Sequence, residues 1–375
     1  MTARLGARSK HVATLSLTRA SITFPFRTGS PDLMTLHASI LARLSLIEGF
    51  PSWRQTLGDP ALQPRLREYR TWEPSATLPS TPTRHERAPG AHGPVPVRIY
   101  QPPPSAPQSP RPALVWVHGG GWVSGDLDST EADWTAREVC VRADAVVVSV
   151  DYRLAVGGVA YPVPHDDVVA AVRWVRDSSA VLGIDPDRIT VGGASAGANL
   201  AAGAVLRLRD DDGWLPVALV LAYSVMHPAL PALSAELAEA LAKLPRMVQV
   251  LAEDVTVMTA NYLGDAADPH GYAMPADGVL GGLCPTLLLD AEYDGLRASS
   301  EAFAAALAKA RVPVRHVTVP GLLHGFLSLP ASLEPVDHGL AVLAETVVHA
   351  RPSRAACGVL PGADDERPAR DEESE

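Results

Sequence analysis

The chain has 375 residues, 47% hydrophobic and 20% charged, a composition typical of a folded globular protein with a sizeable core. The formal net charge is −10 and unevenly spread: residues 1–30 carry +5, residues 364–375 carry −5, and the body between them carries the remaining −10. An acidic body repels a phosphate backbone, which argues against nucleic acid as a partner.

Both ends of the chain differ in composition from the body. Residues 1–33 are rich in Arg, Ser and Thr and resemble a transit peptide only superficially, and they lack the apolar core and cleavage site of a secretory signal. We expect a disordered extension there, with Met34 as a candidate true start, and a disordered acidic tail over 352–375. The folded domain is therefore expected over 34–351.

Cysteine usage and hydropathy bear on the compartment. Cys140, Cys284 and Cys357 lie far apart without CxxC or metal-finger spacing, which suits a reducing compartment. No uninterrupted apolar run reaches about 18 residues, so no membrane span is expected. These features predict a cytoplasmic protein.

The order of elements predicts the fold class. Residues 34–69 show helical periodicity, and a Pro-rich passage over 73–96 separates them from the rest of the chain. Apolar, β-branched runs then alternate with helical segments, which predicts an α/β protein with a mostly parallel, doubly wound sheet covered on both faces. Strands are expected within 95–100, 113–119, 145–152, 188–193, 217–224, 285–294 and 314–321, and helices within 130–144, 166–183, 197–211 and 299–312. Residues 225–275 are too long for a simple crossover and predict helices inserted over the sheet.

The stretch HGGGW comes directly after the strand expected at 113–119. Without side chains, Gly119, Gly120 and Gly121 leave backbone N–H groups that can point at a developing oxyanion. A tight loop without catalytic meaning is the alternative interpretation.

A second motif, GASAG, places Ser195 between a strand and a helix. This is the pattern of a nucleophile held on a sharp turn, with the helix N-terminus and the Ala196 N–H behind it. Small residues that merely let the helix pack on the sheet are the alternative.

A serine nucleophile needs a base, and the base needs a carboxylate. Asp294 and His324 each come after an expected strand, and the order Ser, Asp, His fits this architecture. Glu292 and Asp290 are rival acids, although Asp290 sits within or at the end of the strand and is expected to point elsewhere.

With these motifs the sequence resembles the hormone-sensitive lipase-like family of α/β-hydrolases, in particular its bacterial esterases. HGGGW, DYRLA at 151–155, GASAG, DGL and HGF occur in the family's order, from about Leu36 to Val348. The resemblance implies an α/β-hydrolase fold with a helical cap formed by about 34–69 and 225–265. It also implies site residues: a catalytic triad of Ser195, Asp294 and His324, an oxyanion hole among Gly119, Gly120, Gly121 and Ala196, and Trp122 beside the substrate.

Some positions depart from the family pattern. The family usually has Asp or Thr at Ala194, Pro at Gly295 and Asp at Ala298, and these departures concern the subfamily and the pocket shape. His165, Asp166 and Asp167 resemble a metal cluster, but acids that open a helix are more often caps. We expect no metal and no cofactor.

The leading hypothesis is a serine carboxylesterase that hydrolyses short- to medium-chain esters through an acyl-enzyme. The same machinery could instead serve acyl transfer, deacetylation or formamide hydrolysis of a specialised metabolite. A further alternative is a non-catalytic ligand receptor on the same fold, of the kind that the gibberellin receptors resemble. Such receptors have lost a triad member, whereas all three are present in this sequence. The expected partner is a small-molecule ester. A homodimer is the one association with another protein chain that we keep as an alternative to a monomer.

Overall fold

A single sheet of eight strands organises the described part of this computed structural model, residues 36–72, 78–103 and 109–351. The strand order is β1-β2-β4-β3-β5-β6-β7-β8. The strands are β1 Thr83–Ala88, β2 Val95–Tyr100, β3 Arg111–Val117, β4 Val146–Val150, β5 Ile184–Ala194, β6 Ala218–Ala222, β7 Thr286–Tyr293 and β8 Val314–Leu323. The pairs β1–β2 and β2–β4 are antiparallel and the remaining pairs are parallel, which confirms the expected mostly parallel sheet.

The sheet separates two hydrophobic cores because successive side chains of a strand point to opposite faces. In β3, Val115 and Val117 belong to one core, whereas Leu114 and Trp116 belong to the other. Both faces are buried, so the central strands are apolar throughout and do not alternate with polar residues.

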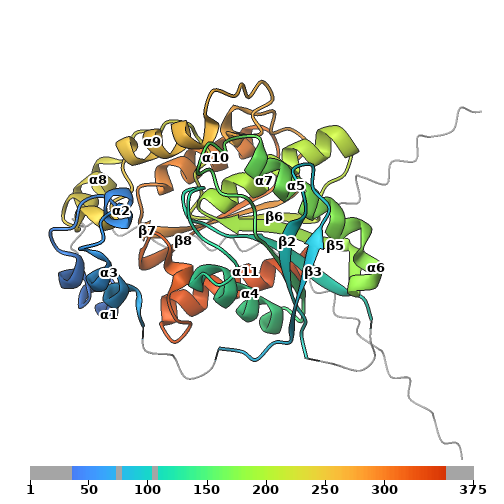
Figure 1. Ribbon diagram of the computed structural model, residues 1–375, viewed down its shortest axis with the longest axis horizontal. Helices are drawn as coiled ribbons and strands as arrows, with labels where there is room; N and C mark the ends of the chain where they lie inside the picture. The colour runs from blue at the N-terminus through green and yellow to red at the C-terminus, as the bar shows by residue number, and fades with distance from the viewer. Residues whose placement is uncertain (1–35, 73–77, 104–108, 352–375) are drawn as a thin grey trace, which may run out of the picture. The chain divides into compact units, whose positions relative to one another are not determined.

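Helices cover both faces of the sheet (Figure 1). The first core includes buried residues of α5 Val163–Asp177, α7 Ala196–Asp212 and α10 Arg297–Lys309, and the second those of α4 Thr130–Arg142 and α11 Glu334–His349. The short α6 Ser179–Leu182 comes after α5. None of the helices in the described ranges combines the length and the apolar character that crossing a membrane requires.

Two elements were not anticipated from the sequence. Strand β1 lies inside the Pro-rich passage that we expected to be a separator, and it pairs with β2 at the sheet edge. Its residues TRHERA are mostly exposed, so the edge strand lacks the apolar pattern by which strands are recognised. Helix α11 comes after β8 in the chain, beyond the last motif, and buries Val336, Leu340 and Leu343.

Two helical segments lie beside the carboxyl ends of the strands, where the HGGGW and GASAG motifs come together. The first contains α1 Ala38–Leu41, η2 Leu44–Ile47, α2 Trp53–Gly58 and α3 Gln63–Arg70. The second, the expected insertion at 225–275, contains α8 Ala235–Ala242, η3 Arg246–Val248, α9 Ala252–Leu263 and η4 Pro275–Asp277. Figure 1 shows α2 beside α8 at one end of the view, and residues of both segments share the second core.

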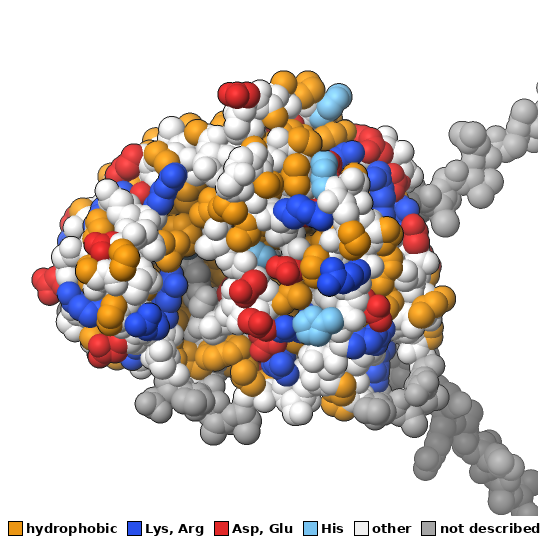
Figure 2. Space-filling model, viewed as in Figure 1, with side chains coloured by type: hydrophobic (Ala, Val, Ile, Leu, Met, Phe, Trp, Pro, Cys, Tyr) orange, Lys and Arg blue, Asp and Glu red, His pale blue; other side chains and the backbone are white. Residues whose placement is uncertain are grey.

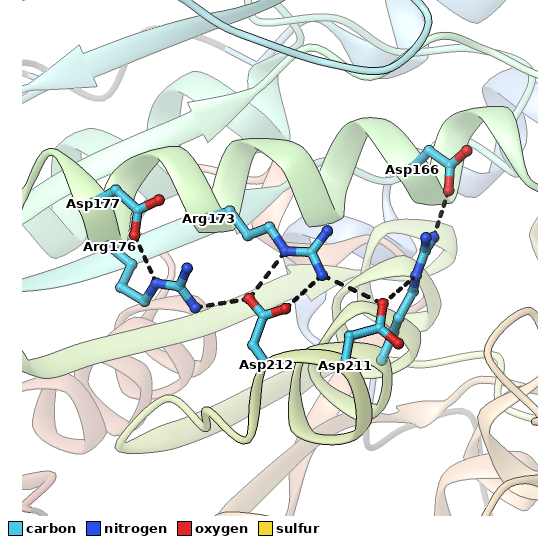
Figure 3. A network of polar contacts seen from close by, with 7 residues as sticks. Asp166, Arg173, Arg176, Asp177, Asp211 and Asp212 are labelled. Carbon is cyan, nitrogen blue, oxygen red and sulfur yellow. Dashed lines mark hydrogen bonds and ion pairs between the residues drawn. The ribbon is translucent and has the colours of Figure 1, made fainter.

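An ion-pair network joins α5 to α7 on the outside of the sheet (Figure 3). Asp212 accepts from both Arg173 (2.6 Å) and Arg176 (2.8 Å), and Arg207 bridges Asp166 and Asp211. These partly exposed pairs align two helices that already share an apolar interface, and each contributes little by itself.

Candidate active site

Ser195 occupies the corner between β5 and α7 with φ 53° and ψ −118°. A positive φ is uncommon for a residue with a Cβ, so the surrounding structure must hold this conformation against its local cost. The Ser195 N–H donates to the carbonyl oxygen of Ala222 (2.9 Å), which ties the corner to β6. The serine therefore stands on the strained strand–turn–helix corner at the carboxyl edge of the sheet.

The glycines around Ser195 allow β3 to approach this corner. A Cβ on Gly197 would lie 2.1 Å from the carbonyl oxygen of Val117 and 2.3 Å from that of His118. A Cβ on Gly193 would lie 2.6 Å from the Val117 oxygen. Packing thus explains the small neighbours, but it does not explain a serine at the corner itself.

His324 and Asp294 form a chain of hydrogen bonds with Ser195. The His324 Nε2 lies 3.1 Å from the Ser195 Oγ, and its Nδ1 lies 2.7 Å from the Asp294 Oδ2. An ionised carboxylate can only accept, so Nδ1 carries the proton and Nε2 accepts from the serine hydroxyl. Asp294 is fully buried and also accepts the Leu296 N–H (2.9 Å), which fixes the carboxylate.

The two rival acids point elsewhere. Glu292 accepts the N–H of Gly321 (2.7 Å), and Asp290 pairs with His316 (2.6 Å). Among the three carboxylates at this strand end, only Asp294 contacts His324 in the structure as described.

The glycine loop after β3 offers donors at the same edge. Within the described residues no acceptor takes up the N–H groups of Gly120, Gly121 or Ala196. Gly120 has φ +122°, and a Cβ there would lie 1.9 Å from the carbonyl oxygen of Ser124, so only glycine fits. The Gly119 N–H, however, donates to Glu131 (2.8 Å), which removes Gly119 from the donors that we expected to be free.

Glu131, on the first turn of α4, supports this loop from behind. One carboxylate oxygen accepts the Gly119 N–H and the other accepts the Trp116 Nε1–H (2.7 Å). Burial raises the pKa of Glu131 to about 7, against the two donors that favour the charged form. Its sequence position resembles an ordinary acid at a helix start, so no signal in the sequence marked it.

His118 and Tyr152 hold the other side of the loop. The His118 ring stacks on Tyr152 with centroids 4.4 Å apart, and the Tyr152 hydroxyl donates to the His118 carbonyl oxygen (3.1 Å). Burial lowers the pKa of His118, so the ring is neutral and its Nδ1 donates to the Gly119 carbonyl oxygen (2.7 Å). His118 thus shapes the loop and does not face the serine.

The side chain of Trp122 packs against the second helical segment. It is 0% exposed and stacks on Tyr262, with ring centroids 4.6 Å apart and ring planes nearly parallel. This stack anchors the end of the glycine loop to α9. Trp122 is also among the residues that line the cavity beside Ser195, and its place beside the substrate stays a prediction.

A cavity of about 1030 Å³ opens beside Ser195 and His324. The two flanking helical segments supply much of its wall, with Trp53, Leu57 and Trp72 from one and Met247 and Met258 from the other. Tyr223, which packs its ring edge-on against His324 (5.0 Å), lines the floor. The space is ample for a small organic molecule and its walls are largely apolar.

The His165, Asp166 and Asp167 run does not form an ion site. His165 is fully buried and stacks on Tyr272, while Asp167 pairs with Arg153 (2.6 Å). No group of His, Cys, Asp or Glu among the described residues has the arrangement to hold a metal ion.

The comparisons with known proteins agree with this geometry. A family described as having the alpha/beta hydrolase fold matches residues 114–328, more than half of the chain. The chain belongs to the hormone-sensitive lipase-like family of α/β-hydrolases. The match runs from β3 to the segment after His324 and so includes the glycine loop and Ser195.

Relatives within this family are named as esterases. The chain is 35% identical over 328 residues to esterase LipI of Mycobacterium tuberculosis, covering 85% of this chain and 95% of that protein. It is also 35% identical over 314 residues to carboxylesterase NlhH of the same species, covering 80% of this chain and 93% of that protein.

Solved structures of family members have the same fold. A bacterial heroin esterase superposes with a TM-score of 0.69 at 28% identity, covering 86% of this chain and 99% of that one. The esterase of Pyrobaculum calidifontis superposes with a TM-score of 0.67 at 29% identity, covering 84% and 98%.

Proposed function

We propose that this protein is a serine carboxylesterase that cleaves small-molecule carboxylic esters through an acyl-enzyme. The observation that carries the proposal is the chain of two hydrogen bonds from Ser195 through His324 to Asp294. The esterase names of relatives that match most of the chain support the same reaction class.

In the first half-reaction the Ser195 Oγ attacks the ester carbonyl carbon while His324 Nε2 takes the hydroxyl proton. Asp294 keeps the proton of His324 on Nδ1 and stabilises the imidazolium that forms. The tetrahedral intermediate collapses, and the alcohol leaves with the proton that His324 returns. Water then repeats the sequence on the acyl-enzyme, releasing the acid and free Ser195.

The negative charge of each tetrahedral intermediate needs donors that are already in place. We assign this role to the backbone N–H groups of Gly120, Gly121 and Ala196, which lack acceptors in the described structure. Ala196 begins α7, so the helix N-terminus adds positive potential at the same point. Gly119 is left out because Glu131 holds its N–H.

We further propose that the two flanking helical segments, about 34–69 and 225–265, act as a cap on a hydrolase domain spanning 34–351. Both line the cavity that contains Ser195 and His324. Residues 1–33 and 352–375, expected to be disordered, lie outside the described residues. A cytoplasmic location and a homodimer remain predictions from the sequence.

Labelling with diethyl p-nitrophenyl phosphate tests the assignment of the nucleophile. The purified enzyme should lose p-nitrophenyl butyrate hydrolysis in step with incorporation of one diethylphosphoryl group, found by mass spectrometry on the peptide that contains Ser195. Modification at another residue, or full activity after labelling of Ser195, would overturn the assignment.

A further inference from the structure

Most charged side chains that line the cavity have partners within the protein. Arg246 pairs with Glu253 (3.0 Å) and with Asp254 (2.8 Å), so it offsets one of the two acidic charges and the cluster keeps one excess negative charge. Asp128 pairs with Arg98 (2.6 Å), whose guanidinium extends from β2. Each of these side chains therefore already has an oppositely charged partner.

Two arginines of the α2–α3 segment are the exception. Arg54 on α2 and Arg70 at the end of α3 both line the cavity, and neither guanidinium forms an ion pair or hydrogen bond with any residue that the structure describes. No acidic residue of this segment lines the cavity with them. On the part of the cavity wall that the α2–α3 segment forms, Arg54 and Arg70 are therefore the charged side chains, in a chain whose net charge is −10.

Their surroundings favour an anion. Both side chains are exposed into the cavity, while the walls around Arg70 partly desolvate its guanidinium and lower its pKa. A guanidinium remains charged under all physiological conditions, so this desolvation is an uncompensated cost until an anion arrives. Trp53 and Trp72 line the same wall and supply apolar contact for the rest of such a ligand.

Figure 2 shows basic side chains on the surface at this end of the molecule. The molecule is hollowed beside the end that carries α1 to α3 in Figure 1, and blue Lys and Arg side chains gather on that side of the hollow.

We propose that Arg54 and Arg70 form a carboxylate-binding subsite, and that the preferred substrates are esters bearing a free carboxylate. The inference rests on the proposed esterase function and adds the substrate class. A planar guanidinium pairs with a carboxylate through two parallel hydrogen bonds, so the subsite would orient the ester as well as attract it. Arg54 and Arg70 are specificity residues and take no part in bond cleavage.

Three esters test the subsite and tell on which side of the ester the carboxylate lies. They are neutral p-nitrophenyl butyrate, mono-p-nitrophenyl glutarate with its carboxylate on the acyl side, and 4-butyryloxybenzoate with its carboxylate on the alcohol side. We expect kcat/KM for at least one charged ester to exceed that for the neutral ester. The double variant Arg54→Gln/Arg70→Gln should lower this charged-to-neutral ratio by about tenfold or more, since charge-assisted hydrogen bonds are lost.

Arg67→Gln is the matched control, because Arg67 lies on the same helix α3 but does not line the cavity. It removes one positive charge of the same kind, where the double variant removes two, and it should leave the ratio unchanged. A fall of similar size in Arg67→Gln, an unchanged ratio in the double variant, or a tenfold preference of the wild type for the neutral ester over both charged ones would overturn the subsite.

Failure of the esterase proposal is distinguishable from failure of the subsite. If the wild type hydrolyses none of the three esters, the proposed function is wrong, and the subsite is then tested by calorimetric titration with glutarate. Binding that is lost in the double variant and retained in Arg67→Gln supports the subsite in that case, and absence of binding to the wild type overturns it.

Discussion

The carboxylate of Glu131 accepts the backbone N–H of Gly119 at 2.8 Å and so connects helix α4 to the glycine loop beside Ser195. Its second oxygen accepts the Trp116 Nε1–H at 2.7 Å, so both oxygens face donors. The buried acid therefore fixes where the next two N–H groups of the loop point, although it does not itself face the cavity serine.

We predict that Glu131→Gln lowers kcat. A glutamine amide has one oxygen and one NH₂, so one of the two donors, Gly119 or Trp116, must face another donor. Displacement of the loop would weaken oxyanion stabilisation, and loss of a single donor of this kind costs about 10²-fold in kcat. Steady-state kinetics with p-nitrophenyl butyrate check this, with Trp116→Phe as the control that removes only the other donor. Equal kcat in Glu131→Gln and the wild type would exclude the proposed role of Glu131 in positioning the glycine loop.

The raised pKa of Glu131 should also make the free energy of unfolding depend on pH. Burial raises the pKa of Glu131 from 4.5 to about 7, so the folded state resists ionisation of this carboxyl. Its destabilising contribution is absent below the unfolded pKa, grows as pH rises towards about 7 and is constant above that value, where it is on the order of 3 kcal/mol. Glutamine cannot ionise, so the melting temperature of Glu131→Gln minus that of the wild type should rise between about pH 4.5 and pH 7 and stay constant above. A difference that does not change with pH would show that Glu131 keeps an ordinary pKa.

Asp294→Asn should lower kcat by about 10⁴-fold, because an amide can hold the His324 ring in the wrong tautomer. Glu292→Gln is the comparison, since Glu292 sits on the same strand end but accepts the N–H of Gly321. It should reduce kcat far less. A larger loss in Glu292→Gln than in Asp294→Asn would mean that the acid has been assigned to the wrong position.

The elements with the strongest local signals were predictable from sequence. The central parallel strands are largely apolar, and Ser195 and Asp294 come directly after β5 and β7, while His324 follows the edge strand β8, so topology brings the three together at the carboxyl ends of the strands. Strand β1 escaped prediction because its polar residues are stabilised by pairing with β2 and not by burial. An edge strand carries no hydrophobic pattern of its own.

The support around the candidate site was not predictable, for a different reason. Glu131 and Trp122 have ordinary local contexts, and only tertiary packing decides that Glu131 accepts the Gly119 N–H and that Trp122 stacks on Tyr262.

Gly295 is an intermediate case. The sequence marked it as a departure from the usual proline, but the structure supplies the cause, since a Cβ there would lie 1.8 Å from the carbonyl oxygen of Val250.

This close approach predicts the effect of Gly295→Ala. The methyl group would push the 249–251 segment of the proposed cap away from the loop that carries Asp294. We expect kcat/KM to fall by about tenfold or more, because small displacements of catalytic groups are costly. Gly281→Ala is the matched control, since a Cβ at Gly281 meets nothing within 4 Å. Wild-type kinetics and melting temperature in Gly295→Ala would show that the cap does not press on this loop.

The last prediction concerns the acyl chain of neutral esters. The cavity of about 1030 Å³ is bounded by α2, α3 and the segment from η3 to α9, which gives it apolar but finite walls. Each buried methylene should add about 0.8 kcal/mol, or roughly fourfold in kcat/KM, until the acyl part of the cavity is filled. We expect the optimum at about two to eight acyl carbons, with Trp122 among the residues that line the cavity beside Ser195. A p-nitrophenyl ester series from acetate to palmitate checks the prediction, with Met258→Ala as the variant that should shift the optimum towards longer chains because its side chain lines the cavity. Rising efficiency through laurate and palmitate, with activation on emulsions, would indicate a lipase with an open groove and contradict the bounded cavity.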